Sequence, residues 1–280
     1  DGEAAAEAAA PLAESDDAAS FAARIEALLA SRRYAAAVAL AENAQARHPD
    51  DQTLLTFGCR AAREAGNLAA LDSQLRRAIA HQPDRPGPRI AAVLEWWQAG
   101  ERSRAFAELH AFLLRFDSDP EVIYQLSTAA TALGATPLIA ELDRHAASLG
   151  QNTNRLKANL VEACLINGDV AGLRRTRIFL PQLAATSDPV LQLWPVVVEN
   201  VFQILDGRPL TSGLPLQSLT RQLHLAPAAY ARFVRFLLSA GRPAAATELL
   251  DHALALYPAS PSLQTLAPGA RLALSRARAA

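Results

Sequence analysis

The stretch QTLLTFGCRAAREAGNLAALDSQLRRAIAHQPDR, residues 52–85, contains the pattern that decides the fold. Apolar residues recur at helical spacing before and after its single turn signal at Gly66: Leu55, Cys59 and Ala62, then Leu68, Leu71 and Leu75. Glycine readily adopts the left-handed conformation that ends a helix, and proline, here Pro83, cannot continue one. The stretch therefore predicts two helices joined by a tight turn.

The same plan recurs along the chain at a fixed interval of 34 residues. Four glycines are separated by this interval (100−66, 134−100, 168−134), and two later ones repeat it (241−207): Gly66, Gly100, Gly134, Gly168, Gly207 and Gly241. Pro49 and Pro83 are also 34 residues apart (83−49). The first repeat turns at Arg32 without a glycine. A fixed period of this length indicates an array of helix pairs in which each unit contacts its neighbours.

The pattern resembles that of the tetratricopeptide repeat (TPR) family, with about seven repeats over residues 18–260. Repeat one has matching residues at Phe21, Tyr34, Ala37, Ala44 and Pro49, and the last repeat at Tyr230, Gly241, Ala246, Ala253 and Pro258. The resemblance implies an all-α fold, a right-handed α-solenoid of antiparallel helix pairs with about 14–16 helices and no sheet. A composition rich in alanine and leucine also favours helices.

The chain divides into three parts. Residues 1–17, DGEAAAEAAAPLAESDD, cannot build a core face, so we expect a flexible linker or a frayed helix. Residues 18–258 form the solenoid. Its sixth repeat, at about 188–226, is degenerate, because Gly168 and Gly207 are 39 residues apart (207−168) and several prolines lie between them. Residues 259–280 are expected to form the C-terminal capping helix that a solenoid requires.

Composition and motifs narrow the function classes. The net charge of −1 gives no basic field to attract nucleic acid, and no apolar run is long enough to span a membrane. Cys59 and Cys164 fall on core-facing positions, so we expect buried thiols without a disulfide. The histidines form no metal-binding motif, and no nucleophile–base motif is present. We therefore predict no catalytic residue, no metal, no cofactor and no enzymatic activity.

The resemblance places ligands in the concave groove, which the first helix of each repeat lines. The residues at exposed groove positions that we select as candidates for partner binding are Arg60, Arg63, Trp97, Tyr124 and Arg155. Guanidinium groups beside aromatic rings could hold a peptide with an acidic group and an apolar anchor. The alternative is that the tryptophans pack in the core and the arginines are solvated. The lysine/asparagine clamp of chaperone adaptors is absent, so chaperone-tail binding is not expected.

Two further expectations come from the second half of the chain. The long apolar helix predicted at 189–206 is a candidate self-association surface that would make a homo-oligomer, through Trp194, Val197, Val201 and Ile204. The degenerate repeat that contains this helix could be a bend in the solenoid, a partner surface, or both. Asp143 and Arg177 occupy the same position in adjacent repeats (177−143 is 34), so they either form an inter-repeat ion pair or are both exposed by a drift in helical phase.

These observations favour a non-catalytic scaffold or adaptor that binds a protein or peptide in the groove. The alternative hypothesis is a regulatory or substrate-recruiting module of a larger enzyme or envelope assembly, for example in polysaccharide synthesis or secretion. That hypothesis is motivated by the low-complexity start without a methionine. We expect a bacterial source, and an exported or periplasmic location rather than a cytoplasmic one.

Overall fold

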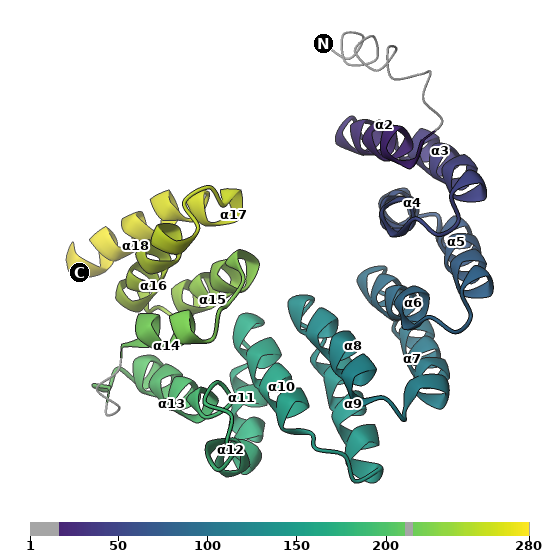
Figure 1. Cartoon of the computed structure of the whole chain (residues 1–280). Helices are drawn as coiled ribbons and strands as arrows, with labels where there is room; N and C mark the ends of the chain where they lie inside the picture. The colour runs from purple at the N-terminus through teal and green to yellow at the C-terminus, as the bar shows by residue number, and fades with distance from the viewer. Residues whose placement is uncertain (1–16, 211–214, 280) are drawn as a thin grey trace. The chain divides into compact units, whose positions relative to one another are not determined.

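The computed structural model describes residues 17–210 and 215–279, and these residues form helices and turns without any strand (Figure 1). The expected all-α fold of antiparallel helix pairs is confirmed. The chain separates into an N-terminal unit that ends at Ser118 and a C-terminal unit that begins at Asp119. Each unit has a hydrophobic core of its own. Residues 1–16, most of the expected linker, lie outside the described part of the chain, and Asp17 caps the first described helix.

The N-terminal unit is a series of helix pairs: α2 (Ala18–Ala30) with α3 (Tyr34–Arg47), α4 (Gln52–Glu64) with α5 (Leu68–His81), and α6 (Pro86–Gln98) with α7 (Arg102–Phe116). Fully buried alanines, among them Ala37, Ala41 and Ala61, lie where the helices of this unit pack together. Small side chains let helix axes approach closely, which is why alanine occupies these positions.

Every pair of this kind turns through the same backbone motif. Gly66 has φ +66°, and the Asn67 N–H beyond it donates to the Ala62 carbonyl at 2.8 Å. The same hydrogen bond and a positive φ recur at the other five glycines of the register: Gly100, Gly134, Gly168, Gly207 and Gly241. This arrangement satisfies carbonyl groups that the end of a helix leaves unpaired. In the first pair Arg32 takes the glycine position with φ +57°.

In the C-terminal unit the first helices of the first two repeats are regular, and the elements that follow depart from the 34-residue pattern of helix pairs. Its elements are α8 (Pro120–Ala132), α9 (Thr136–Ser148), α10 (Asn154–Ile166), α11 (Val170–Thr176), the 3-10 turn η2 (Arg177–Phe179), α12 (Leu180–Ala184), α13 (Leu193–Asp206), α14 (Leu216–Gln222), α15 (Pro227–Ser239), α16 (Pro243–Leu256), α17 (Pro261–Gln264) and α18 (Ala267–Ala279). Helix α8 starts at Pro120 and its N-cap is Asp119, whose carboxylate accepts from the Glu121 N–H at 3.0 Å.

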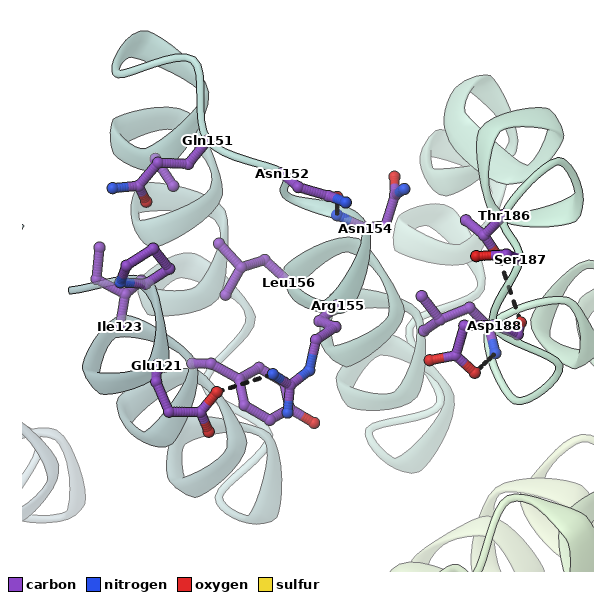
Figure 2. A pocket seen from close by; sticks show the side chains of 14 residues that line it. Glu121, Ile123, Gln151, Asn152, Asn154, Arg155, Leu156, Thr186, Ser187 and Asp188 are labelled. Carbon is purple, nitrogen blue, oxygen red and sulfur yellow. Dashed lines mark hydrogen bonds and ion pairs between the residues drawn. The ribbon is translucent and has the colours of Figure 1, made fainter. Parts of the chain in front are cut away.

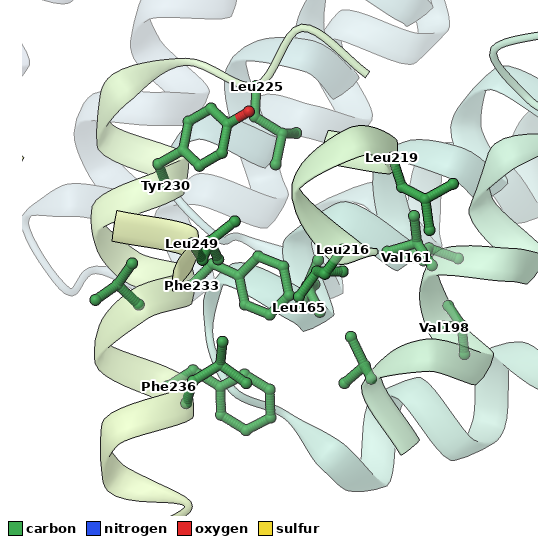
Figure 3. Close-up of a cluster of buried hydrophobic side chains, with 14 of the residues drawn as sticks. Val161, Leu165, Val198, Leu216, Leu219, Leu225, Tyr230, Phe233, Phe236 and Leu249 are labelled. Carbon is green, nitrogen blue, oxygen red and sulfur yellow. The ribbon is translucent and has the colours of Figure 1, made fainter. Parts of the chain in front are cut away.

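The degenerate sixth repeat changes which helices are neighbours. Helix α15, the first helix of the last repeat, packs directly against α10 of the fifth repeat. Arg232 of α15 donates to the Ala132 carbonyl at the end of α8 at 2.8 Å. Figure 3 shows Phe233 and Phe236 of α15 in one cluster with residues of α10 and α14. The short α14 replaces the long second helix that a regular repeat would supply.

The residues that we expected to form a self-association surface on α13 are covered within their own unit. Trp194, Val197 and Val201 are 4%, 0% and 0% exposed, and Ile204 is half-buried against the same core. Helix α13 is apolar on the faces that α10, α12 and α14 cover, so its side chains fill the interior of the C-terminal unit. An apolar helix in sequence does not distinguish a partner surface from a core that distant segments complete.

The expected ion pair between Asp143 and Arg177 is also not formed. Helix α11 ends at Thr176, so Arg177 lies in the 3-10 turn and the helical register that equated it with Asp143 is lost. Its guanidinium instead lies 3.1 Å from the Glu199 carboxylate. Burial raises the pKa of the Asp143 carboxyl.

The segment expected to form the C-terminal cap contains two helices, the short α17 and the longer α18. Helix α18 starts at Ala267 and includes Pro268 in its first turn. Proline is tolerated in the first turn of a helix, where its missing N–H has no partner to lose. Helix α18 packs on α16, with Ala270 fully buried.

Candidate functional site

The five candidate binding residues belong to different units. Arg60, Arg63 and Trp97 lie in the N-terminal unit, and Tyr124 and Arg155 lie in the C-terminal unit. The structure therefore gives two separate local environments.

In the N-terminal unit Arg63 is engaged by a neighbouring helix. Its Nη1 lies 2.6 Å from Glu95 Oε2, and the two side chains are 20% and 13% exposed. Burial raises the pKa of the Glu95 carboxyl, and the adjacent Arg63 charge opposes that rise. Breaking this pair would leave a buried charge without a partner. Arg63 is thus a structural residue that ties α4 to α6 rather than an available ligand contact.

Trp97 is likewise partly covered by its own chain. The Arg102 guanidinium lies 3.5 Å from the centre of the Trp97 ring, and the Phe106 ring lies edge-on at 6.4 Å. Arg102 also donates to the Trp97 carbonyl at 2.6 Å. The neighbouring Trp96 is 2% exposed and packs in the core. For Trp96 this agrees with the alternative that the tryptophans are core residues. Of the three candidates in this unit, Arg60 alone is exposed, whereas Arg63 and Trp97 are partly buried.

The C-terminal unit contains a cavity of about 370 Å³ beside the N-terminal ends of α8 and α10 (Figure 2). Tyr124 and Arg155 both line it, so the structure brings these two candidates together. The buried part of the lining is apolar: Ile123, Ala146, Leu156 and Leu191. The polar uncharged residues around it are more exposed: Gln151, Asn152, Asn154, Thr186 and Ser187. This combination can hold an apolar group and hydrogen-bond the chain that bears it.

Arg155 is held in place by two contacts from α8. Its Cζ lies 3.3 Å from the centre of the Tyr124 ring, and its Nη1 lies 2.9 Å from Glu121 Oε2. Figure 2 shows the Arg155 guanidinium beside the Glu121 carboxylate, with a dashed line marking their contact. Arg155 and Glu121 occupy the same position in adjacent repeats (155−121 is 34). The positive charge of Arg155 is therefore already balanced within the chain.

Local hydrogen bonds fix the loops at the edge of the cavity. Asp188 Oδ1 accepts from the Val190 N–H at 2.8 Å and from the Leu191 N–H at 3.4 Å. Asn152 Oδ1 accepts from the Asn154 N–H at 3.0 Å. Such contacts between a short side chain and nearby backbone hold a turn without a regular element. The loops at the mouth of the cavity thus have conformations that these hydrogen bonds fix.

Beyond the cavity, buried polar side chains join α8 to α10. Asn159 Nδ2 donates to Ser127 Oγ at 2.9 Å, and Thr131 Oγ1 donates to the Ser127 carbonyl at 2.9 Å. One turn along α10, burial raises the pKa of the Glu162 carboxyl to about 7. A buried polar network is favourable only when all its partners are in place. The hydrogen bonds around Ser127 therefore fix the spacing of α8 and α10, the helices that supply Tyr124 and Arg155.

A second cavity of about 320 Å³ lies against α9, α10 and α11 and is lined by Leu160, Cys164 and Phe179 among others. Burial raises the pKa of the Cys164 thiol to about 12, so the thiol stays protonated and unreactive at neutral pH. The pKa of Cys59 is raised for the same reason. Both cysteines are buried, as expected. The Cys164 thiol thus gives this cavity no thiolate nucleophile at neutral pH.

Nothing in the described ranges assembles a metal-binding cluster of three His, Cys, Asp or Glu side chains. Nor does any helix there have the length and apolarity needed to cross a membrane.

Sequence reasoning found Tyr124 and Arg155 but missed the groups that surround them. Glu121 could have been found, because the 34-residue register places it opposite Arg155. Thr186, Ser187 and Asp188 could not, since they follow the irregular α11–α12 segment, for which no register exists.

The helix pairs, their 34-residue register and their left-handed turns define a TPR-like helical-repeat protein. No protein-family model matches the sequence, and a comparison with curated proteins finds no match. One similar solved structure is a tetratricopeptide repeat protein from Parabacteroides merdae ATCC 43184. The two sequences are 10% identical, the TM-score is 0.42, and the match covers 91% of this chain and 98% of that chain. Another is the APC/C hetero-tetramer Cut9–Hcn1, with 12% identity, a TM-score of 0.34, and coverage of 90% and 55%. Likenesses this weak carry no argument about function.

Proposed function

We propose that this chain is a non-catalytic binding module that holds a peptide segment of a partner protein in the cavity of the C-terminal unit. The observation that supports the proposal is the lining of that cavity. Buried apolar side chains form its interior, and amide and hydroxyl groups stand at its mouth. An apolar side chain of a partner fits the first set, and the amide groups of its backbone fit the second.

A peptide fits this site better than the other classes of ligand. The chain's net charge of −1 offers no general attraction to nucleic acid. The cavity is at the lower end of the roughly 300–1,000 Å³ typical of small-molecule sites, and its polar lining is exposed rather than enclosing. Arg60, exposed on the N-terminal unit, stays a candidate for a separate contact with the same partner.

Photo-crosslinking tests the proposal directly. A photoreactive amino acid is placed at Asn154, in the cavity lining, and at Arg144, an exposed control position on α9 of the same unit. We expect the first position to capture a partner and the second to capture none above background. The partner is then purified and titrated by calorimetry against the full chain.

Two variants make the titration specific to the cavity. Ser187→Arg places a long side chain at the cavity mouth, whereas Gln222→Arg makes the same change at an exposed position on α14. The proposal predicts at least tenfold weaker binding for the first variant and unchanged binding for the second. Equal affinity for both variants, or equal crosslinking at both positions, would refute it.

A further inference from the structure

We infer that the cavity selects a peptide in which an apolar residue is followed or preceded by a basic one, and that Asp188 recognises the basic side chain. This inference rests on the proposed function and adds the chemistry of the ligand. It is carried by the distribution of charge and of apolar groups around the cavity.

The interior determines the anchoring residue. Ile123, Leu156 and Leu191 are 1%, 4% and 9% exposed and present aliphatic carbon to the cavity, and no charged side chain is buried among the lining residues. A charged group entering this interior would lose its water without gaining a partner. A leucine-sized aliphatic side chain is the group that this surface accommodates.

The mouth determines the neighbouring residue. Three charged side chains line it: Glu121, Arg155 and Asp188. Arg155 and Glu121 neutralise each other at 2.9 Å, and Tyr124 holds the guanidinium against its ring. No Arg, Lys or His among residues 17–210 and 215–279 lies within ion-pair distance of the Asp188 carboxylate, although two backbone N–H groups fix it. The mouth therefore has one uncompensated negative charge.

A cationic side chain is the complement of that charge. Lysine or arginine has an aliphatic stem that can lie along the apolar edge while its head reaches the carboxylate. An acidic neighbour would face Asp188 and would have to displace Glu121 from Arg155. The exposed carboxylate makes the expected gain modest, about two- to fivefold in affinity, as for other ion pairs at a surface.

Blocked peptides test the inference with the full chain. The probes are acetyl-Ala-Leu-Lys-Ala-amide and its variants with Lys replaced by Gln, Lys replaced by Glu, or Leu replaced by Ala, titrated by NMR. We expect the Lys-to-Gln change to weaken binding two- to fivefold and the Lys-to-Glu change to weaken it further. The Leu-to-Ala change should weaken binding at least tenfold, because it removes the buried apolar surface.

Asp188→Asn isolates the charge, since the amide oxygen can still accept from the Val190 and Leu191 N–H groups. In this variant Lys and Gln probes should bind equally, a coupling that a double-mutant cycle measures. Glu141→Gln, on α9, is the control and should keep the full preference. Tighter binding of the Glu probe would assign an acidic ligand instead and overturn the inference. So would a Lys preference that persists in Asp188→Asn, or the absence of any shift at Leu156 and Tyr124. If the crosslinked partner binds the cavity through a segment without a basic residue, this inference fails while the proposed function stands.

Discussion

Replacing Arg32 with glycine should stabilise the N-terminal unit. Arg32 has φ +57°, and a side chain with a Cβ is strained in this left-handed conformation by roughly 1–2 kcal/mol. Glycine relieves the strain but loses more backbone freedom on folding, which costs about 0.5–1 kcal/mol. The Arg32 side chain is exposed, so its removal subtracts little packing. The net expectation is a gain of about 0.5–1 kcal/mol in the free energy of unfolding.

The converse substitution uses the equivalent position of the next repeat. Gly66 has φ +66°, and a Cβ built there would meet no atom within 4 Å. Gly66→Ala therefore introduces backbone strain without a steric clash, and it should destabilise the same unit by about 1 kcal/mol.

Urea denaturation of both variants measures the two effects. Trp96 and Trp97 report on the N-terminal unit, and a Trp194→Phe background removes the tryptophan of the C-terminal unit from the fluorescence signal. Native-state hydrogen exchange of residues 18–47 and 52–81 then shows which helix pair is affected. A neutral Gly66→Ala, or an Arg32→Gly variant less stable than the parent, would refute the conformational argument.

Three further substitutions test the polar contacts. Arg63→Leu leaves the Glu95 carboxylate buried without its partner and should cost about 3 kcal/mol, more at pH 8 than at pH 5, by urea unfolding. Asn159→Ala deprives Ser127 of its buried donor and should cost about 1–3 kcal/mol in the same assay. The pKa of Glu162 is raised from its ordinary 4.5 to about 7, so the wild-type chain loses stability as pH rises through that window. The free energy of unfolding of Glu162→Gln relative to the wild type should therefore rise between pH 4.5 and pH 7 and stay constant above pH 7. Parallel stability profiles of the two proteins over this pH range would contradict the raised pKa of Glu162.

Most of the regular architecture could be predicted from the sequence. Glycine at a fixed interval determines where the backbone can turn left-handed, so each helix boundary beside Gly66 or Gly241 follows from residue type alone. Even the exception at Arg32 was visible as a missing glycine. The capping carboxylate of Asp51 is similarly local, since it accepts from the Leu54 N–H three residues away.

The irregular segments could not be predicted in this way. The 34-residue register placed Arg177 in a helix, but that helix ends at Thr176. Pro181, which lies in the first turn of α12, disfavours one continuous helix through this segment. The burial of Val197 depends on α10, α12 and α14, which pack around α13. Some of these helices are distant from Val197 in the sequence, so a local pattern of apolar residues does not predict the contacts. The candidate site shares this limit: Arg155 and Glu121 follow the register, whereas Asp188 does not.

The central claim is that the cavity at the starts of α8 and α10 holds the partner. Hydrogen–deuterium exchange of the full chain, measured with and without the purified partner, tests it most directly. The account predicts protection at residues 120–124, 151–156 and 186–191, with hydrogen exchange elsewhere in the chain unchanged. Protection confined to other segments, with exchange at these three unaltered under saturating partner, would contradict it.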